Sequence, residues 1–123
     1  MIYCNINIEF ELTVLERLAE RYGVRKGLWG IEILNEPILE DMWEAMNVTE
    51  RYPAVDPEKA KGTKPNTMEF IRDFYKKATT GSVNICRKRN MSFHDAFRLK
   101  AWKDFMREDK YKNVVLDTHQ YLM

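Results

Sequence analysis

The side chains best suited to chemistry in this chain are an asparagine and a glutamate that stand directly before a proline, Asn35, Glu36 and Pro37. They close the apolar run Leu28 to Leu34, which is typical of a strand buried on both faces of a parallel sheet. Pro37 has no N–H to donate, so it ends the strand and favours an extended conformation of Glu36. A carboxyl group fixed at such a strand end can have its pKa raised towards neutrality, which makes Glu36 a candidate general acid or base.

Glu36 also has a structural interpretation, because a carboxylate at a strand end can form an ion pair with an arginine of a neighbouring strand. Both interpretations stay open on spacing alone. Asn35 can donate a hydrogen bond to a substrate hydroxyl or anchor the following loop. Glu32 lies on the same side of the strand as Glu36 but about 13 Å back along it. We therefore expect Glu32 to be buried and ion-paired, and not to be the partner carboxylate.

A second polar cluster, Asp117, His119 and Tyr121, follows the apolar run Val114 to Leu116. The three residues alternate along the chain, so they share one side of the strand end and present an imidazole and a phenol to one cleft. This arrangement suits hydrogen bonding to a substrate. The alternative is a histidine and a tyrosine satisfied by the local backbone, since His-x-Tyr is a weak motif.

A third polar pair, His94 and Asp95, ends a weaker strand candidate that begins at Met91. The basic run Arg87 to Arg89 before it predicts a solvated surface turn. Because the carboxyl ends of parallel strands meet at one edge of the sheet, we expect all three polar clusters to line a common cleft.

Three aromatic residues, Trp43, Phe97 and Trp102, could stack on a sugar ring. Trp102 recurs with other apolar residues at helical spacing, which favours a place in the core. Trp43 belongs to a short helix expected within a long polar connection over residues 38 to 65, where the apolar residues at helical spacing are Leu39, Met42, Trp43 and Met46.

Amphipathic segments separate the strand candidates. Thr13 with Glu16 predicts a helix start, and Gly23 can end that helix. Asn66 with Glu69 repeats the capping pattern before a second apolar stripe, formed by Phe70, Ile71, Phe74, Tyr75 and Ala78. Helices that alternate with strands predict an α/β fold with a parallel sheet and crossover helices.

Composition narrows the function classes. The 123 residues suit one domain, with 45% hydrophobic residues and a net charge of +1 that gives no sign of a nucleic-acid partner. Cys4 and Cys86 indicate neither a disulfide scaffold nor a metal site. No glycine-rich phosphate loop follows a strand, which disfavours a nucleotide cofactor and a doubly wound enzyme. The chain shows no secretory signal and no apolar stretch of membrane-spanning length, and its localisation stays open.

Three segments in this order, GIEILNEP at Gly30–Pro37, HDAF at His94–Phe97 and VVLDTHQY at Val114–Tyr121, resemble successive motifs of family 5 glycoside hydrolases. The resemblance is closest to the exo-β-1,3-glucanase and cellulase-like branch, and it covers roughly residues 11 to 123. It implies a fragment of a (β/α)8 TIM barrel, about strands four to six with their helices. Residues 1–123 would then form a partial catalytic domain, which lacks the first three strands and the last two.

By that resemblance, Glu36 corresponds to the acid/base of a retaining enzyme that acts on β-glucans or β-glucosides. Asn35 corresponds to the residue that binds the sugar 2-hydroxyl, and His119 and Tyr121 correspond to residues of the subsite that holds the reacting sugar. Retaining hydrolysis needs a second carboxylate about 5–5.5 Å from the first. The family carries it after the seventh strand, and this chain stops at Met123. We therefore expect a fragment that is inactive alone.

One further expectation follows from an incomplete barrel. Its bare sheet edges favour self-association. The alternative from a different class is a small non-catalytic α/β module that binds carbohydrate through Trp43, His119 and Tyr121. Such a module would unfold cooperatively and bind sugar without hydrolysing it.

Overall fold

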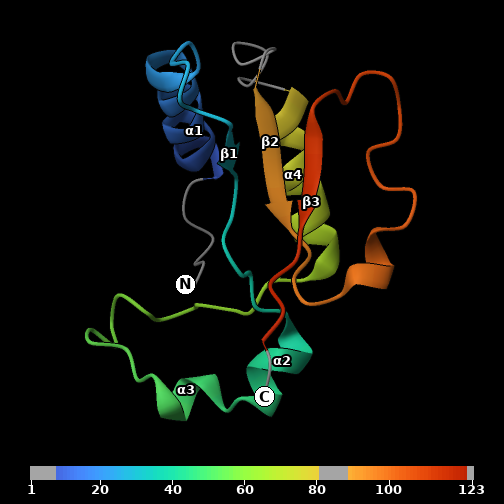
Figure 1. Ribbon diagram of the computed structural model, residues 1–123. Coiled ribbons are helices and arrows are strands. Elements are labelled where there is room, and N and C mark those ends of the chain that lie inside the picture. The colour runs from blue at the N-terminus through green and yellow to red at the C-terminus, as the bar shows by residue number, and fades with distance from the viewer. Residues whose placement is uncertain (1–7, 81–88, 122–123) are drawn as a thin grey trace.

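The centre of the computed structural model, which describes residues 8–80 and 89–121, is a parallel sheet of three strands in the order β1-β2-β3. The strands are β1 Gly30–Glu32, β2 Asn90–His94 and β3 Val114–Asp117, and Figure 1 shows them side by side. The α/β class and the parallel sheet are therefore confirmed. Within the described ranges, the sheet stays open and closes no barrel.

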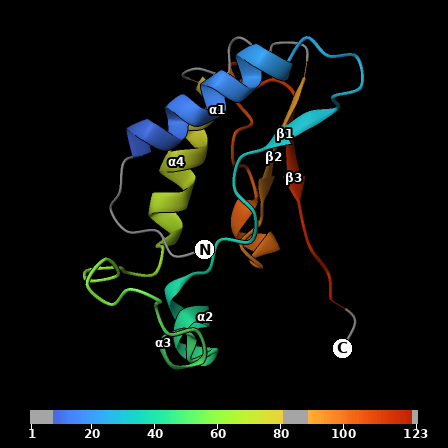
Figure 2. The same ribbon diagram turned by 90° about the vertical axis from the view of Figure 1, so that its left-hand side faces the viewer.

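Two long helices cover one face of the sheet, α1 Ile8–Tyr22 and α4 Met68–Thr80. Figure 2 shows both on the same side of the strands, and no described helix covers the other side. The connection from β2 to β3 carries a short 3₁₀ helix, η2 Leu99–Trp102, where the sequence predicted a helical stretch. None of the described helices is long and apolar enough to cross a membrane.

The core lies between α4 and β2. The buried face of α4 matches the predicted stripe, with Ile71, Phe74, Tyr75 and Ala78 buried. Rings from three elements meet there, since Phe93 lies 5.0 Å from Tyr75 and 5.2 Å from Trp102 between ring centroids. Trp102 is thus a core residue, as its spacing predicted. Burial of each such ring contributes about 1.5–3 kcal/mol, which fixes β2 firmly against α4.

The start of α1 differs from the prediction. Thr13 lies inside the helix, where its hydroxyl donates to the carbonyl oxygen of Glu9 at 2.7 Å, so it is not the cap. The predicted capping box is wrong because apolar residues upstream, including Ile8, pack on the core and extend the helix. The end is as predicted, since α1 stops at Tyr22 and the Gly23 N–H donates to the Ala19 carbonyl.

The cap of α4 is shifted by one residue. The Phe70 N–H donates to the Thr67 hydroxyl at 3.1 Å, so Thr67 supplies the cap predicted for Asn66. Asn66 instead forms an isolated parallel bridge with Leu39. This pairing ties the two ends of the long connection together, which sequence spacing could not show.

The first strand is shorter and less buried than predicted. Only Gly30–Glu32 pair with β2, and Glu32 is exposed. Within β1 itself, burial on both faces is wrong because the described helices cover one face only, whereas Ile33 and Leu34 just after it are buried. Gly30 is required there, since a Cβ atom at that position would lie 2.6 Å from the Asn90 carbonyl oxygen.

The long connection after β1 contains the predicted short helix, α2 Glu40–Ala45, and a second one that was not predicted, α3 Val48–Arg51. The basic run before β2 is not a freely solvated turn at Arg89, whose guanidinium donates to the carbonyl oxygens of Gly23 and Arg25 at 2.9 and 2.7 Å. Arg87 and Lys88 lie outside the described residues, as do Cys4 and Cys86.

Candidate active site

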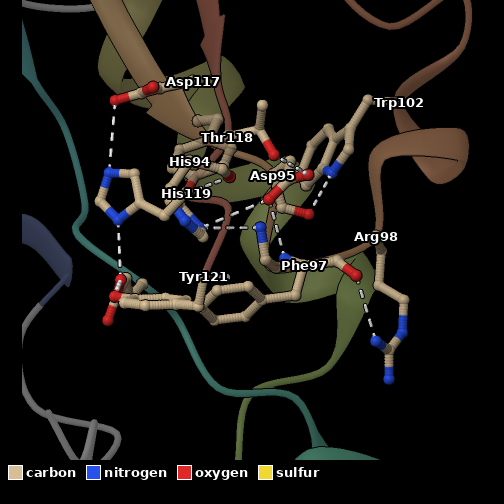
Figure 3. A network of polar contacts seen from close by, with 12 residues as sticks. His94, Asp95, Phe97, Arg98, Trp102, Asp117, Thr118, His119 and Tyr121 are labelled. Atoms are coloured by element: carbon tan, nitrogen blue, oxygen red, sulfur yellow. Dashed lines mark hydrogen bonds and ion pairs between the residues drawn. The ribbon is translucent and has the colours of Figure 1, made fainter. Parts of the chain in front are cut away.

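The carboxylate of Glu36 joins the end of β1 to the end of β3. Nδ1 of His119 lies 2.7 Å from Oε1 of Glu36, and the Tyr121 hydroxyl donates to the same oxygen. His119 and Tyr121 share one side of the chain, as their alternation predicted (Figure 3). The structure therefore brings three of the predicted site residues into direct contact.

The backbone of Glu36 is not extended. Its φ is 45°, in the left-handed region that a residue with a side chain rarely adopts. The prediction from the following proline is therefore wrong at this position. Such a conformation costs about 1–3 kcal/mol, and the contacts of the carboxylate with His119 and Tyr121 help to offset it.

The ionisation of Glu36 also differs from the prediction. Hydrogen bonds from Tyr121, and then from His119, hold the pKa of Glu36 below its ordinary value of 4.5. A raised pKa is wrong here because the carboxylate is half-exposed and accepts two hydrogen bonds, which favour the charged form. The same hydrogen bonds raise the pKa values of His119 and Tyr121. Glu36 is therefore an acceptor in this state.

Two further carboxylates surround His119. Oδ2 of Asp117 lies 3.5 Å from its Nε2, and Glu32, Asp117 and His119 each have a polar atom within 4.8 Å of the others. Glu32 is exposed, so the prediction of a buried ion pair is wrong, because its face of the sheet has no described cover. Partial burial of its carboxyl group, and then the charge of Asp117, raise the pKa of Glu32.

His94 lies fully buried beside this cluster. Its Nδ1 accepts the Ala96 N–H at 3.0 Å, which leaves the hydrogen of the neutral ring on Nε2. The ring meets those of His119 and Phe97 edge-on, with centroids 4.4 and 4.8 Å apart (Figure 3). Burial, and then the charge of His119, lower the pKa of His94. The neutral ring of His94 thus packs against the ring of His119.

Asp95 stabilises the turn after β2 by accepting two hydrogen bonds. One carboxylate oxygen accepts the Phe97 N–H at 2.8 Å, and the other accepts the Thr118 hydroxyl at 3.0 Å. Ala96 and Phe97 have φ values of 52° and 58°, so this side-chain acceptor holds two successive left-handed residues. The pair His94 and Asp95 was a weak candidate from sequence, and the structure gives both residues positioning contacts.

A cavity of about 780 Å³ opens beside Glu36. Its described lining includes five of the six predicted site residues, and three apolar residues that the sequence did not single out for the site: Asn35, Glu36, Ile38, Met42, Met46, Phe97, His119 and Tyr121. Trp43 is not in that lining, and its indole N–H donates to the Thr49 hydroxyl at 3.3 Å. The four-residue spacing of Met42 and Met46 was visible in the sequence, but it did not reveal which way that helix face points.

The donor set of Glu36, His94 and His119, whose polar atoms lie within 4.8 Å of one another, does not fit a metal ion. A metal-bound histidine needs a free lone pair and normally donates its other N–H to an acceptor. In His94 the lone pair of Nδ1 already accepts the Ala96 N–H, and Nε2 carries the hydrogen. The tautomer of His94 therefore argues against metal binding by this group.

Fold and site together define a parallel α/β unit with a carboxylate, an imidazole and a phenol at the carboxyl edge of its strands, an arrangement suited to proton transfer. No family model matches the chain. It is similar to a glucan 1,3-beta-glucosidase of Schwanniomyces occidentalis, with 27% identity over 119 residues that make up 94% of this chain and 22% of that protein. The chain thus spans about a fifth of that relative. The similarity indicates a relationship to glycoside hydrolases, whereas membership of family 5 stays a prediction.

Proposed function

We propose that this chain carries part of the catalytic domain of a retaining glycoside hydrolase, with Glu36 as the proton-transfer group for β-glucosidic bonds. The observation that carries the proposal is the carboxylate of Glu36, which lines a cavity while bonded to both His119 and Tyr121. The similarity to a glucan 1,3-beta-glucosidase supports the substrate class. The resemblance to the exo-β-1,3-glucanase branch of family 5 supports the same choice.

In this proposal each cavity residue has one task. Glu36 protonates the leaving oxygen, and its ionised form later takes the proton of the attacking water. Asn35 donates to the sugar 2-hydroxyl, and Phe97 offers a ring face to the substrate. The lowered pKa of Glu36 favours the base step. The acid step requires the substrate to displace water and so to raise that pKa by desolvation.

A retaining mechanism also needs a nucleophilic carboxylate about 5–5.5 Å from the acid/base. Among the described residues that line the cavity, Glu36 is the one carboxylate. Glu32 and Asp117 gather around His119 and are outside that lining. We therefore expect the 123-residue polypeptide to bind β-glucosides without hydrolysing them.

A glycosyl donor with a leaving group on the α face can test Glu36 as a general base, because the acceptor sugar displaces that group directly and no nucleophilic carboxylate is needed. In α-D-glucosyl fluoride, fluoride leaves from the α face while a sugar hydroxyl attacks C1 from the β face and loses its proton to a general base. We expect the purified chain to release fluoride and form a β-glucoside when glucosyl fluoride and an acceptor glucoside are supplied. The measurements are a fluoride electrode and chromatography of the product.

The matched control is Glu36→Gln, which keeps the size of the side chain and removes the base. It should lower the rate to that of the uncatalysed reaction. Equal rates for both proteins, with sugar binding intact, would remove Glu36 from a catalytic role.

That same result would favour the second candidate, a non-catalytic carbohydrate-binding module. The single carboxylate in the described cavity lining is the observation in its favour. A binding module needs hydrogen-bonding groups such as His119 and Tyr121 but no proton transfer. It would bind sugar equally well before and after Glu36→Gln, with a sharp thermal transition in both proteins.

A further inference from the structure

One side of the cavity is apolar. We call Ile38, Met42 and Met46 the apolar wall, and all three belong to the segment that follows Glu36 along the chain. Met42 lies in α2 and Met46 is its C-cap, so the two side chains stand one turn apart on one face of this helix. The wall therefore faces the same space as the carboxylate.

The wall is a poor match for a second sugar ring. Each ring of a glucan carries several hydroxyl groups, and these side chains offer no N–H or O–H donor. Hydroxyls placed against them would lose hydrogen bonds to water without replacement. Flat aromatic rings bind sugar faces well, but methionine and isoleucine are not flat. Flexible methionine side chains are instead suited to irregular apolar groups.

The position of the wall relates it to the leaving group. A general acid must reach the glycosidic oxygen, which joins the sugar to the group that leaves. The wall is contiguous with Glu36 in the chain, whereas His119 and Tyr121 reach the cavity from the end of β3. A sugar held by the β3 residues would thus place its aglycone beside the wall.

We propose that the apolar wall binds the aglycone of the substrate, and that the preferred substrates are β-glucosides of apolar alkyl or aryl alcohols. This inference rests on the proposed function, because it needs a glucoside held at Glu36. It goes further in selecting apolar β-glucosides over β-glucan chains.

The test is a titration of the 123-residue chain labelled with ¹³C at its methionine methyl groups. The ligands are methyl β-D-glucoside, hexyl β-D-glucoside and laminaribiose, a β-1,3-linked pair of glucoses. The signals of Met42 and Met46 should shift with the hexyl glucoside. Those of Met91 and Met106, which are buried in the core, should not move and serve as internal references. Burial of several methylene groups should make the hexyl glucoside bind at least about tenfold more tightly than the methyl glucoside.

Two variants locate the effect. Met42→Gln and Met46→Gln should each remove most of the difference in affinity between the hexyl and the methyl glucoside. The matched control is Met68→Gln, since Met68 is also half-buried but lies at the start of α4, outside the lining of this cavity. It should keep the full difference in affinity. Unmoved core methyl signals show that each variant is folded.

The outcomes separate this inference from the proposed function. Tighter binding of laminaribiose than of hexyl glucoside would overturn the apolar aglycone, and fluoride release that is lost in Glu36→Gln would leave the glucosidase proposal standing. Equal binding of hexyl β-D-glucoside and hexanol would show an apolar pocket with no use for the sugar, which overturns the inference. If the chain releases no fluoride but still binds hexyl glucoside more tightly than methyl glucoside, the result would count against the catalytic role of Glu36 and not against the apolar aglycone.

Discussion

His119 and Glu36 are 83 positions apart in the chain, yet Nδ1 of His119 lies 2.7 Å from Oε1 of Glu36. This contact holds the end of β1 against the end of β3, with β2 between them. It also links two ionisable groups whose pKa values move in opposite directions, downward for Glu36 and upward for His119. The charged pair is therefore favoured, and its stability must depend on pH.

The contact should stabilise the folded chain most between about pH 4.5 and about pH 6.5, the ordinary pKa values of its two groups. The stability that comes from the lowered pKa of Glu36 is fully present above pH 4.5 and is lost as the pH falls through that lowered pKa. The stability that comes from the raised pKa of His119 is fully present below pH 6.5 and is lost as the pH rises through that raised pKa. Melting temperatures of the chain and of His119→Gln across this range measure the effect.

The difference between those two proteins should be largest inside the window and shrink on either side. Asp117 also contacts His119, so Asp117→Asn is a useful companion variant that leaves the Glu36 contact in place. A difference that stays constant with pH would mean that the pair contributes through packing alone.

Removal of the Tyr121 hydroxyl should raise the pKa of Glu36. That hydrogen bond is the largest cause of the lowered value, so Tyr121→Phe should move the carboxyl titration towards the ordinary value of 4.5. The ¹³C chemical shift of the Glu36 carboxyl carbon, followed against pH, measures the change. The internal reference is Glu11 on α1, whose pKa is raised by partial burial and which should titrate identically in both proteins. An unchanged Glu36 titration would show that the hydroxyl does not bond the carboxylate in solution.

The link between Asp95 and Thr118 should matter for stability. Thr118→Val removes the hydroxyl that Asp95 accepts and should cost about 1–3 kcal/mol of unfolding free energy, because a buried carboxylate oxygen loses its partner. Thr118→Ser keeps the hydroxyl and is the matched control. Urea denaturation followed by circular dichroism gives both values. A Thr118→Val chain that is as stable as the unchanged chain would contradict a stabilising role of this hydrogen bond.

His94 should carry its hydrogen on Nε2. The Ala96 N–H occupies Nδ1, and burial lowers the pKa of the ring, so we expect the neutral Nε2–H form to persist as the pH falls below the ordinary value of 6.5. Long-range ¹H–¹⁵N spectra of the imidazole ring distinguish the two tautomers. His119, whose pKa is raised, should be protonated at a higher pH than His94 in the same spectra. A hydrogen found on Nδ1 of His94 would contradict the Ala96 contact and reopen the case for metal binding.

The outer edge of β1 should promote association between chains. β1 lies at the end of the strand order, and Trp29 just before it is 64% exposed. Trp29→Lys puts a charge beside this edge and should reduce self-association measured by sedimentation velocity. Val55→Lys, at an exposed position away from the sheet, is the control for added charge. Equal association of all three proteins would exclude this edge as the contact.

The sequence located the three strand ends because polar clusters stop apolar runs abruptly, and parallel connection makes such ends converge. Glu36, His119 and Tyr121 meet for that reason. The lowered pKa of Glu36 could not be read in advance, since it depends on hydrogen bonds from residues that follow β3, and the left-handed backbone of Glu36 was not expected before a proline. The rule that a residue before proline is extended considers only that residue and the proline, and no contact made across the fold.

The predicted helix boundaries were wrong by a few residues for a similar reason. Thr13 fitted a capping pattern, but packing of upstream apolar residues extended α1 past it. The apolar wall was missed because the direction of a short loop helix is set by what it packs against. Met42 and Met46 had the spacing of a helix face, and only the fold shows that this face lines the cavity.

The distance in sequence between the partners of the site also has a kinetic meaning. Tyr121 and Glu36 are 85 positions apart, so their contact closes a loop that spans most of the chain. Loop closure of that length is entropically unfavourable until the intervening sheet has formed, and contacts of long sequence separation form slowly. Among the three described strands, β3 is the last to emerge during synthesis. The proposed affinity for a glucoside would therefore appear only after β3 has docked, and a fluorescent glucoside would report that docking in real time.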